Sequence, residues 1–326
     1  MRWIARPWLE KARPTVERRV LAPAGAVVET ARAVGVRARI SLVRQRAGVV
    51  RRFPEPVRHR PAPRVVAVLT HVVDPQRDRE SGVERLRRTL EGLLESLDHA
   101  RVELVLNTLP GQHVENGLPD YLRSRLEVRE RVGVEPLFLG FEAQQEFVER
   151  QDTCDWFMFL EDDLVLRDAL LLEKLAYFND AAPPEAVLLP HRYELWNGRK
   201  MYIDLRAKRR PGENRVTGRL TRIDVGGWSF AEFENPHSGW YCLSRAQLER
   251  WLATGRRWYG LASFQDPRAS AATGCLEECF RLYKPHPDNM NFLELHHLGT
   301  KYSEIYAGFH GPESLIADWE AYRPPA

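Results

Sequence analysis

The sequence is poor in cysteine and has no long hydrophobic run. Its four cysteines, among 326 residues, stand at irregular intervals, which excludes a disulfide framework and favours a reducing compartment. No stretch reaches the roughly 18 uninterrupted apolar residues that a membrane-spanning helix needs, so a polytopic membrane protein is excluded. Hydrophobic residues still make up 44% of the chain, enough for a folded core, which excludes a wholly disordered protein.

Several nucleotide-binding and hydrolase motifs are also absent. The sequence holds no Gly-rich phosphate loop of the Walker or dinucleotide type and no Gly-x-Ser-x-Gly elbow. These absences count against a kinase-like ATPase, a dehydrogenase and an α/β-hydrolase. Cys275 and Cys279 lie one helical turn apart, but no second Cys or His pair has the spacing of a zinc site. We therefore expect both thiols to pack in the core.

Charge is distributed unevenly along the chain. The formal net charge is +3, but residues 1–64 carry 16 Lys and Arg against 4 acids, a local net of +12. The remaining residues carry 32 bases and 41 acids, a net of −9. This pattern favours a basic leader joined to an acidic catalytic body, and it indicates no nucleic-acid partner.

The leader has the spacing of a helix and a Pro-rich end. Apolar residues recur at helical intervals between arginines, at Val27, Ala31, Val34, Ala38 and Leu42, and Trp3 and Trp8 stand near the start. Such a segment either lies on an anionic membrane surface or is a solvated basic helix or disordered. Prolines from 54 to 63 indicate a linker. The expected domains are therefore a leader with its linker, residues 1–63, and a catalytic body, residues 64–326.

The body alternates apolar strands with amphipathic helices. Expected strands are 64–70, 102–107, 136–139 and 155–160, and expected helices cover 83–97 and 144–149. This order predicts an α/β fold with a mostly parallel, Rossmann-like sheet and flanking helices. Further along we expect a small antiparallel excursion formed by 202–205 and 218–225, a strand at 240–243, a helix capped by Ser244 and a helix over 274–282.

An acidic triplet gives the strongest chemical signal. Glu161, Asp162 and Asp163 directly follow the apolar strand 155–160. Three carboxylates beside a core edge are costly unless a cation offsets them, and a hard divalent ion uses one or two carboxylates together with phosphate and water. Ligands of parallel α/β sheets bind beyond the carboxyl ends of the strands. The alternative is an acidic helix N-terminus that stabilises the helix dipole.

Here the sequence resembles nucleotide-sugar-dependent glycosyltransferases with the A-type fold, in particular family 2. The triplet is similar to their acidic DxD-type signature, and residues 86–94 are similar to the first helix of many members. Residues 238–248 resemble the acceptor-side segment, and Glu277-Glu278 before 280–282 resembles the acidic pair that holds the base in inverting members. The order of these short motifs covers roughly residues 64–300. The family's usual Glu-Asp pair is Glu-Glu here, which leaves the identity of the base open.

The resemblance implies roles for individual residues. Asp163 would bind Mn2+ or Mg2+ that bridges the donor diphosphate, and Glu161 and Asp162 would contact ribose or metal-bound water. Glu278, or Glu277, would deprotonate the acceptor hydroxyl, with inversion at the anomeric carbon.

Further residues are implied near both ends of the body. His296 and His297 are candidate metal ligands, or else partly buried structural histidines, and Lys301 could meet a phosphate. Thr70, His71 and Asp74 stand at the end of the first strand, where these enzymes hold the nucleobase and ribose.

The sequence thus favours a metal-dependent, inverting glycosyltransferase with a nucleotide-sugar donor and a glycan or lipid-linked acceptor. Its expected role is bacterial surface polysaccharide or glycolipid assembly, in the cytoplasm and peripheral on the inner face of the cell membrane. Two alternatives stay open. One is another divalent-metal enzyme of phosphate esters, a nucleotidyltransferase or phosphohydrolase, and the other is a non-catalytic carbohydrate-binding protein with the same fold.

The leader's charge generates a first prediction. Deletion of residues 1–60 should leave the body folded and reduce binding to anionic vesicles, because 15 of the leader's 16 basic residues and both of its tryptophans are removed together. Co-sedimentation with vesicles measures this, and circular dichroism controls for folding. Equal vesicle binding by the full chain and the truncated chain would contradict the membrane interpretation.

Overall fold

The computed structural model describes residues 61–204, 222–233, 235–254 and 266–310, without the side chains of 306–310. The chain divides into two compact units, residues 1–60 and 61–326, and the description concerns the second. The predicted leader helix and its membrane contact lie outside the described residues. Among the helices that are described, none combines the length and apolarity needed to cross a membrane.

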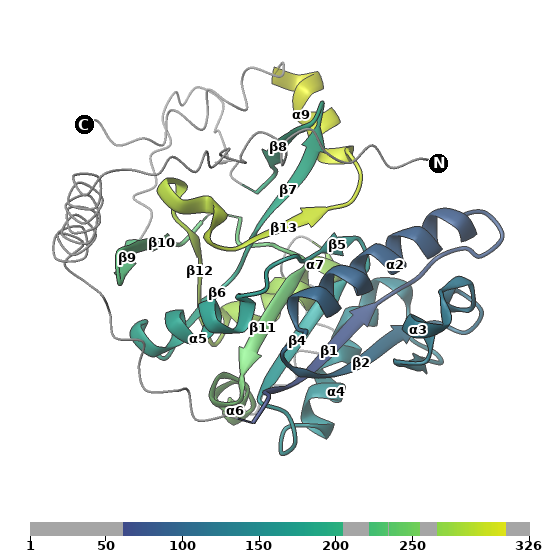
Figure 1. Ribbon diagram of the computed structural model, residues 1–326, viewed down its shortest axis with the longest axis horizontal. Coiled ribbons are helices and arrows are strands. Elements are labelled where there is room, and N and C mark those ends of the chain that lie inside the picture. Colours follow the sequence, from purple (N-terminus) through teal and green to yellow (C-terminus); the bar gives the residue numbers. More distant parts are fainter. Residues whose placement is uncertain (1–60, 205–221, 234, 255–265, 311–326) are drawn as a thin grey trace, which may run out of the picture. The chain divides into compact units, whose positions relative to one another are not determined.

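The main sheet has five strands in the order β11-β4-β1-β2-β3 (Figure 1). Its strands are β1 (Arg64–Thr70), β2 (Arg101–Thr108), β3 (Leu126–Glu130), β4 (Trp156–Glu161) and β11 (Trp240–Ser244). The first four run parallel, and β11 pairs antiparallel with β4. The prediction of an α/β fold with a mostly parallel, Rossmann-like sheet is therefore confirmed for this sheet.

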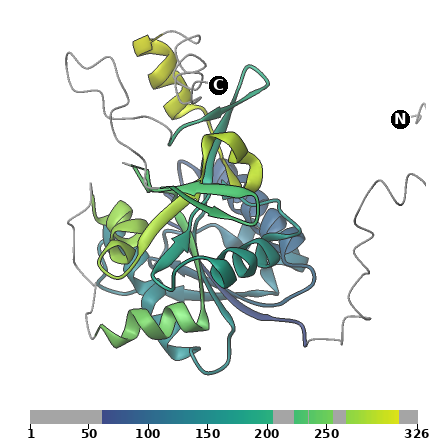
Figure 2. The ribbon, with the colours of Figure 1, turned by 90° about the vertical axis from the view of Figure 1, so that its left-hand side faces the viewer.

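Helices cover both faces of the main sheet (Figures 1 and 2). Strand β1 is buried on both faces, which explains its continuous β-branched sequence. Val65 and Ala67 pack in the same cluster as α2 (Arg79–Ser96) and α5 (Leu171–Ala181). Val66 and Val68 pack in a second cluster with α4 (Glu142–Glu149) and α6 (Arg245–Ala253).

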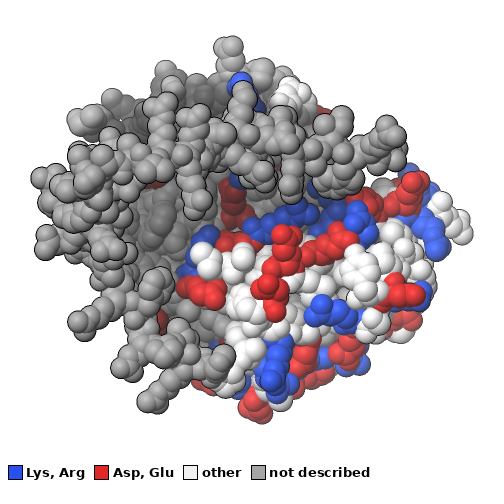
Figure 3. Space-filling view, in the orientation of Figure 1, with Lys and Arg blue, Asp and Glu red and all other residues white. Residues whose placement is uncertain are grey.

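The outer side of α2 is held by charge pairs. Arg87 lies between Glu84 and Glu91, three residues before it and four after it, and bonds to both. Figure 3 shows acidic and basic side chains intermixed on the visible face of the described residues. At α6, the predicted cap is confirmed, because Ser244 and Gln247 form a reciprocal capping box.

Two mixed four-stranded sheets adjoin the main sheet. One has the order β6-β12-β10-β9, and the other has the order β5-β13-β7-β8. Their strands are β5 (Leu164–Val165), β6 (Ala186–Leu188), β7 (His191–Trp196), β8 (Arg199–Tyr202), β9 (Arg222–Val225), β10 (Trp228–Ala231), β12 (Arg281–Pro285) and β13 (Glu294–His297). The predicted antiparallel excursion is only partly observed: β8 and β9 are antiparallel to β7 and β10, in different sheets, and 205–221 lies outside the described residues.

Two local predictions were wrong. Residues 136–139 form the 3-10 helix η3 (Pro136–Phe141), and the third strand is β3. Strand β3 lies at the sheet edge with mostly exposed, charged residues, so it carries little apolar signal. The expected helix over 274–282 is shorter, because α8 (Cys275–Glu277) follows the π-helical turn η4 (Ser270–Gly274) and Arg281 already belongs to β12.

The remaining helices are short, except for the last. They are η2 (Glu115–Gly117), α3 (Asp120–Arg123), α7 (Pro267–Ala269), η5 (Pro287–Phe292) and α9 (Lys301–His310). Residues of α7 and of the start of α9 line the same cavity as the last residues of β1 and β4.

Candidate active site

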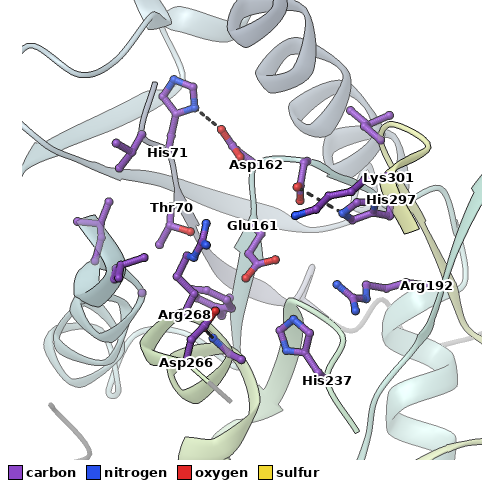
Figure 4. Close-up of a pocket in the computed structure, with 18 of the residues that line it drawn as sticks. Thr70, His71, Glu161, Asp162, Arg192, His237, Asp266, Arg268, His297 and Lys301 are labelled. Carbon is purple, nitrogen blue, oxygen red and sulfur yellow. Dashed lines mark hydrogen bonds and ion pairs between the residues drawn. The ribbon is translucent and has the colours of Figure 1, made fainter. Parts of the chain in front are cut away.

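A cavity of about 660 Å³ opens at the carboxyl ends of β1 and β4 (Figure 4). The parallel register pairs Thr70 with Glu161, the last residues of these two strands, and both line the cavity. Asp162 and Asp163 follow directly, while Pro136–Gly140 of η3, α7 and the start of α9 supply other walls. The described residues thus have a cavity beyond the strand ends, where the sequence predicts the site.

Glu161 lies between cationic residues in the middle of the cavity. Figure 4 shows Arg268 on one side of it and Arg192 on the other. Burial, followed by repulsion from Asp163, raises the pKa of Glu161 to about 8, although Arg192 opposes the shift. A carboxyl with this pKa is largely protonated at neutral pH and can donate as well as accept a hydrogen bond.

Asp162 is tied to α2 behind the cavity. Its Oδ2 contacts His71 Nδ1 and accepts a hydrogen bond from Arg85 at 3.1 Å. The hydroxyl of Thr89 donates to the Asp162 backbone carbonyl at 2.8 Å. These contacts engage one oxygen of the Asp162 carboxylate and fix the turn that carries the acidic triplet.

Asp163 has a carboxylate oxygen that is buried and has no hydrogen-bond partner. This oxygen is Oδ1, and Oδ2 lies 3.5 Å from His297 Nε2. Burial raises the pKa of Asp163, and the nearby His297 opposes this shift. An unpaired buried carboxylate oxygen beside an imidazole nitrogen is a donor set suited to a cation.

His297 is held by a carboxylate on its other side. Its Nδ1 lies 3.0 Å from Glu194 Oε1, and Glu194 also accepts hydrogen bonds from the backbone N–H groups of Tyr302 and Ser303. Burial alone would raise the pKa of Glu194, but these hydrogen bonds lower it below its ordinary value.

His296 does not join the other two predicted metal ligands. Neighbouring residues of a strand point to opposite faces, and His296 stacks on Tyr193, with the ring centroids 5.1 Å apart, instead of lining the cavity. No group of three or more Cys, His, Asp or Glu within the described ranges could hold a metal ion. The pair Asp163 and His297 still fits an ion that takes its other ligands from phosphate and water, as Mg2+ does.

A buried charge network supports one wall of the cavity. Arg192 lines the cavity and bonds through two guanidinium nitrogens to Asp204, which also accepts from Lys284 at 3.1 Å. Burial alone would raise the pKa of Asp204, but the two cations hold it well below its usual range. Burial lowers the pKa of Lys284 to about 8. The network therefore keeps a cationic Arg192 at the cavity wall.

The opposite end of the cavity is formed by Asp266 and α7, which the π-helical turn η4 follows in the chain. Asp266 caps α7, and its Oδ1 accepts from Ala269 N–H at 2.8 Å. Thr273 of the turn bonds to His237 Nδ1 at 3.1 Å, and burial lowers the pKa of His237 to about 3, so this imidazole is neutral. Among the described lining residues, Asp266 is the only carboxylate from outside the triplet.

The structure brings together some of the predicted site residues and not others. Thr70, His71, Glu161, Asp162, Asp163, His297 and Lys301 line the cavity. Asp74 is exposed in the loop after β1 and accepts a hydrogen bond from Gln76 N–H. Glu277 and Glu278 are exposed at the end of α8 and do not line the cavity, so their predicted role as base has no geometric support.

Sequence analysis missed several polar residues of the cavity, four of which carry a guanidinium, imidazole or carboxyl group. Arg192, His237, Asp266 and Arg268 stand in no motif and follow no strand of the main sheet. A weak signal was present for Asp266, because Asp before Pro is typical of a helix start. The other three reach the cavity only through tertiary packing.

No protein-family model matches the chain, and no curated protein matches it. One similar solved structure is mannose-1-phosphate geranyltransferase from Thermus thermophilus, at 14% identity and a TM-score of 0.37, covering 69% of this chain and 74% of that chain. Another is a glycosyltransferase involved in the glycosylation of the major capsid of PBCV-1, at 12% identity and a TM-score of 0.35, covering 78% of this chain and 100% of that chain. At these values neither likeness bears on activity.

A glycine beside Glu161 generates a prediction. Gly239 has a φ of +62°, and a Cβ there would lie 2.4 Å from Glu161 Oε2. Gly239→Ala should therefore displace the Glu161 carboxyl. It should lower the free energy of unfolding by more than about 1–2 kcal/mol, which is the cost of the left-handed backbone conformation alone. Thermal or urea unfolding measures the loss.

The matched control is Gly198→Ala. Gly198 also has a positive φ, +75°, but a Cβ there would meet nothing within 4 Å. The control should show the strain without the clash. Equal losses of stability in both variants would mean that Gly239 does not constrain Glu161.

Proposed function

We propose that the chain is a metal-dependent glycosyltransferase that moves a sugar from a nucleotide-sugar donor to a hydroxyl of a glycan or lipid-linked acceptor. The observation that carries the proposal is the Asp163–His297 pair, with its unused carboxylate oxygen, at the carboxyl end of a parallel strand. The cationic residues Lys301 and Arg268 line the same cavity. A diphosphate with a divalent cation has the charges that this mixed lining would complement.

The cavity residues support distinct steps of such a transfer. Asp163 and His297 would hold Mn2+ or Mg2+, which supplies positive charge where the leaving nucleoside diphosphate becomes more negative. Lys301 and Arg268 bind phosphate oxygens, and Arg192 is held in place by Asp204 for an anionic or hydroxyl group of the substrate. The apolar residues of η3 exclude water from one wall.

Asp266 is proposed as the base in place of Glu277 and Glu278. It faces the Glu161 side of the cavity from α7 (Figure 4), and its Oδ1 bond to Ala269 N–H fixes the carboxylate. A carboxylate in that position can accept the proton of an acceptor hydroxyl as the oxygen attacks the anomeric carbon with inversion. The segment that sequence analysis chose is adjacent in the chain, but its acids point to solvent.

The proposed setting is bacterial surface polysaccharide or glycolipid assembly at the inner face of the cell membrane. It rests on the leader, with its net charge of +12 and its tryptophans among arginines. An acceptor carried by a lipid would be delivered at that surface.

The metal site generates a prediction that begins with identification of the donor. A thermal-shift screen of UDP-, GDP-, dTDP- and CMP-sugars with and without Mn2+ finds the nucleotide, because a ligand of the folded state raises the melting temperature. Asp163→Asn keeps the side-chain shape and removes one ligand charge. It should weaken Mn2+-dependent binding of the matching nucleotide at least about tenfold, measured by calorimetric titration.

The control for this variant is Asp98→Asn, at a side chain that is 77% exposed and remote from the cavity. It removes the same charge and should bind as the wild type does. Without metal, Asp163→Asn should slightly raise stability, since it removes a carboxylate that burial destabilises and that Asp162 repels. Metal-independent binding of equal strength in wild type and Asp163→Asn would identify the triplet as a structural cap.

The assignment of the base generates a further prediction. Asp266→Asn should lower turnover by about 100-fold or more with little change in donor affinity, because a base acts on the acceptor in the transition state. The substitution preserves the cap of α7, since Asn also caps helices well. Release of nucleotide from the donor in the presence of acceptor measures turnover.

Glu278→Gln is the comparison variant for this measurement. An exposed side chain outside the cavity should leave turnover near the wild-type rate. A large loss in Glu278→Gln together with normal turnover in Asp266→Asn would return the role of base to the acidic pair.

A further inference from the structure

Glu194 is a carboxylate that the proposed chemistry does not touch. It lies on β7, has no exposed surface and does not line the cavity. It nevertheless contacts two elements that do reach the cavity, the end of β13 through His297 and the first turn of α9. Three nitrogen atoms, of His297, Tyr302 and Ser303, lie within hydrogen-bond distance of Glu194. A wholly buried carboxylate is costly unless each of these nitrogens donates a hydrogen bond to it.

The first contact determines which imidazole nitrogen faces the cavity. An ionised carboxylate only accepts hydrogen bonds, so His297 Nδ1, at 3.0 Å from Glu194, must carry a proton. In the neutral ring the lone pair then lies on Nε2, the nitrogen 3.5 Å from Asp163 Oδ2. A neutral imidazole binds a metal through such a lone pair, and a carboxylate on its other nitrogen orients it.

The second contact places the start of α9. The N–H groups of Tyr302 and Ser303 donate to Glu194 at 3.2 and 2.7 Å, and they belong to the first turn of the helix, which has no intrahelical partner for them. Lys301 and Tyr302 both line the cavity. The same carboxylate therefore holds a metal-ligand candidate and the helix that carries Lys301.

We propose that Glu194 is a positioning residue that fixes the Nδ1–H tautomer of His297 and seats the first turn of α9 at the cavity. The proposal rests on the proposed function, because the value of this tautomer is that it turns the Nε2 lone pair toward a metal ion beside Asp163. It concerns the arrangement of the protein before any ligand binds, so it can be tested separately from the metal site.

Glu194→Gln is the informative variant. It conserves volume, but an amide has one accepting oxygen and an NH2 group that only donates. Three donors converge on the wild-type carboxylate, so the amide leaves at least one of them facing another donor. Glu294→Gln is the matched control, since Glu294 lies on β13 of the same sheet but bonds to Lys200 and Tyr202, away from His297.

Two measurements separate positioning from folding. The first is the 15N spectrum of the His297 ring in metal-free protein, at a pH where the ring is neutral, with His297→Asn used to assign its signals. Wild type and Glu294→Gln should show the Nδ1–H tautomer, and Glu194→Gln should gain Nε2–H. The second is binding of Mn2+ alone, followed by the electron paramagnetic resonance of free Mn2+, which should weaken about 10- to 100-fold in Glu194→Gln and not in the control.

The outcomes distinguish this inference from the proposed function. An Nε2–H tautomer in the wild type overturns the positioning role, even if Glu194→Gln fails to fold. Unchanged tautomer and Mn2+ affinity in a folded Glu194→Gln overturn it as well. If the tautomer changes as expected but the wild type binds no Mn2+, the positioning role holds and the metal site fails.

Discussion

The parallel pairing of β4 with β1 brings a run of three carboxylates to the edge of a buried sheet. The other residues of the site are arranged around the negative charge of these carboxylates. Strand β4 is apolar up to Glu161 and is paired with β1 along its length, so the turn that follows it is held at the edge of the sheet. Each of the three acids has a different environment. Asp162 accepts a hydrogen bond from Arg85 of α2 through one carboxylate oxygen, and burial raises the pKa of Glu161 to about 8. Asp163 has one buried oxygen without a hydrogen-bond partner.

The elements that surround the triplet come from distant parts of the chain. His297 arrives on β13 and Arg192 on β7, both in a sheet separate from the one that carries the triplet. Buried carboxylates hold both side chains, Glu194 for the imidazole and Asp204 for the guanidinium. Buried polar groups of this kind are stable only when their partners are complete, so they determine side-chain direction more strictly than apolar packing does.

Local patterns predicted the parts of the fold that are buried in a regular way. β1, β4 and α2 were recognised because their burial produces continuous or helical apolar spacing. Strand β3 was not predicted, because an exposed edge strand needs few apolar residues. Residues Pro136–Leu139 were wrongly predicted as a strand, because their apolar side chains belong to a 3-10 helix that forms a wall of the cavity. Glu277 and Glu278, the predicted base, are exposed and lie outside the cavity lining, since neighbouring acids in a sequence do not reveal which way a short helix faces.

The sequence by itself determined the class of fold and the position of the acidic triplet at the end of a strand, because both follow from contacts between residues near in the chain. Only the tertiary structure decided which side chains meet there. It turned His296 away from the cavity and His297 toward it, since neighbours on a strand face opposite sides. It also recruited Arg192, His237 and Asp266, whose places depend on how separate sheets and turns pack together, which no local pattern encodes.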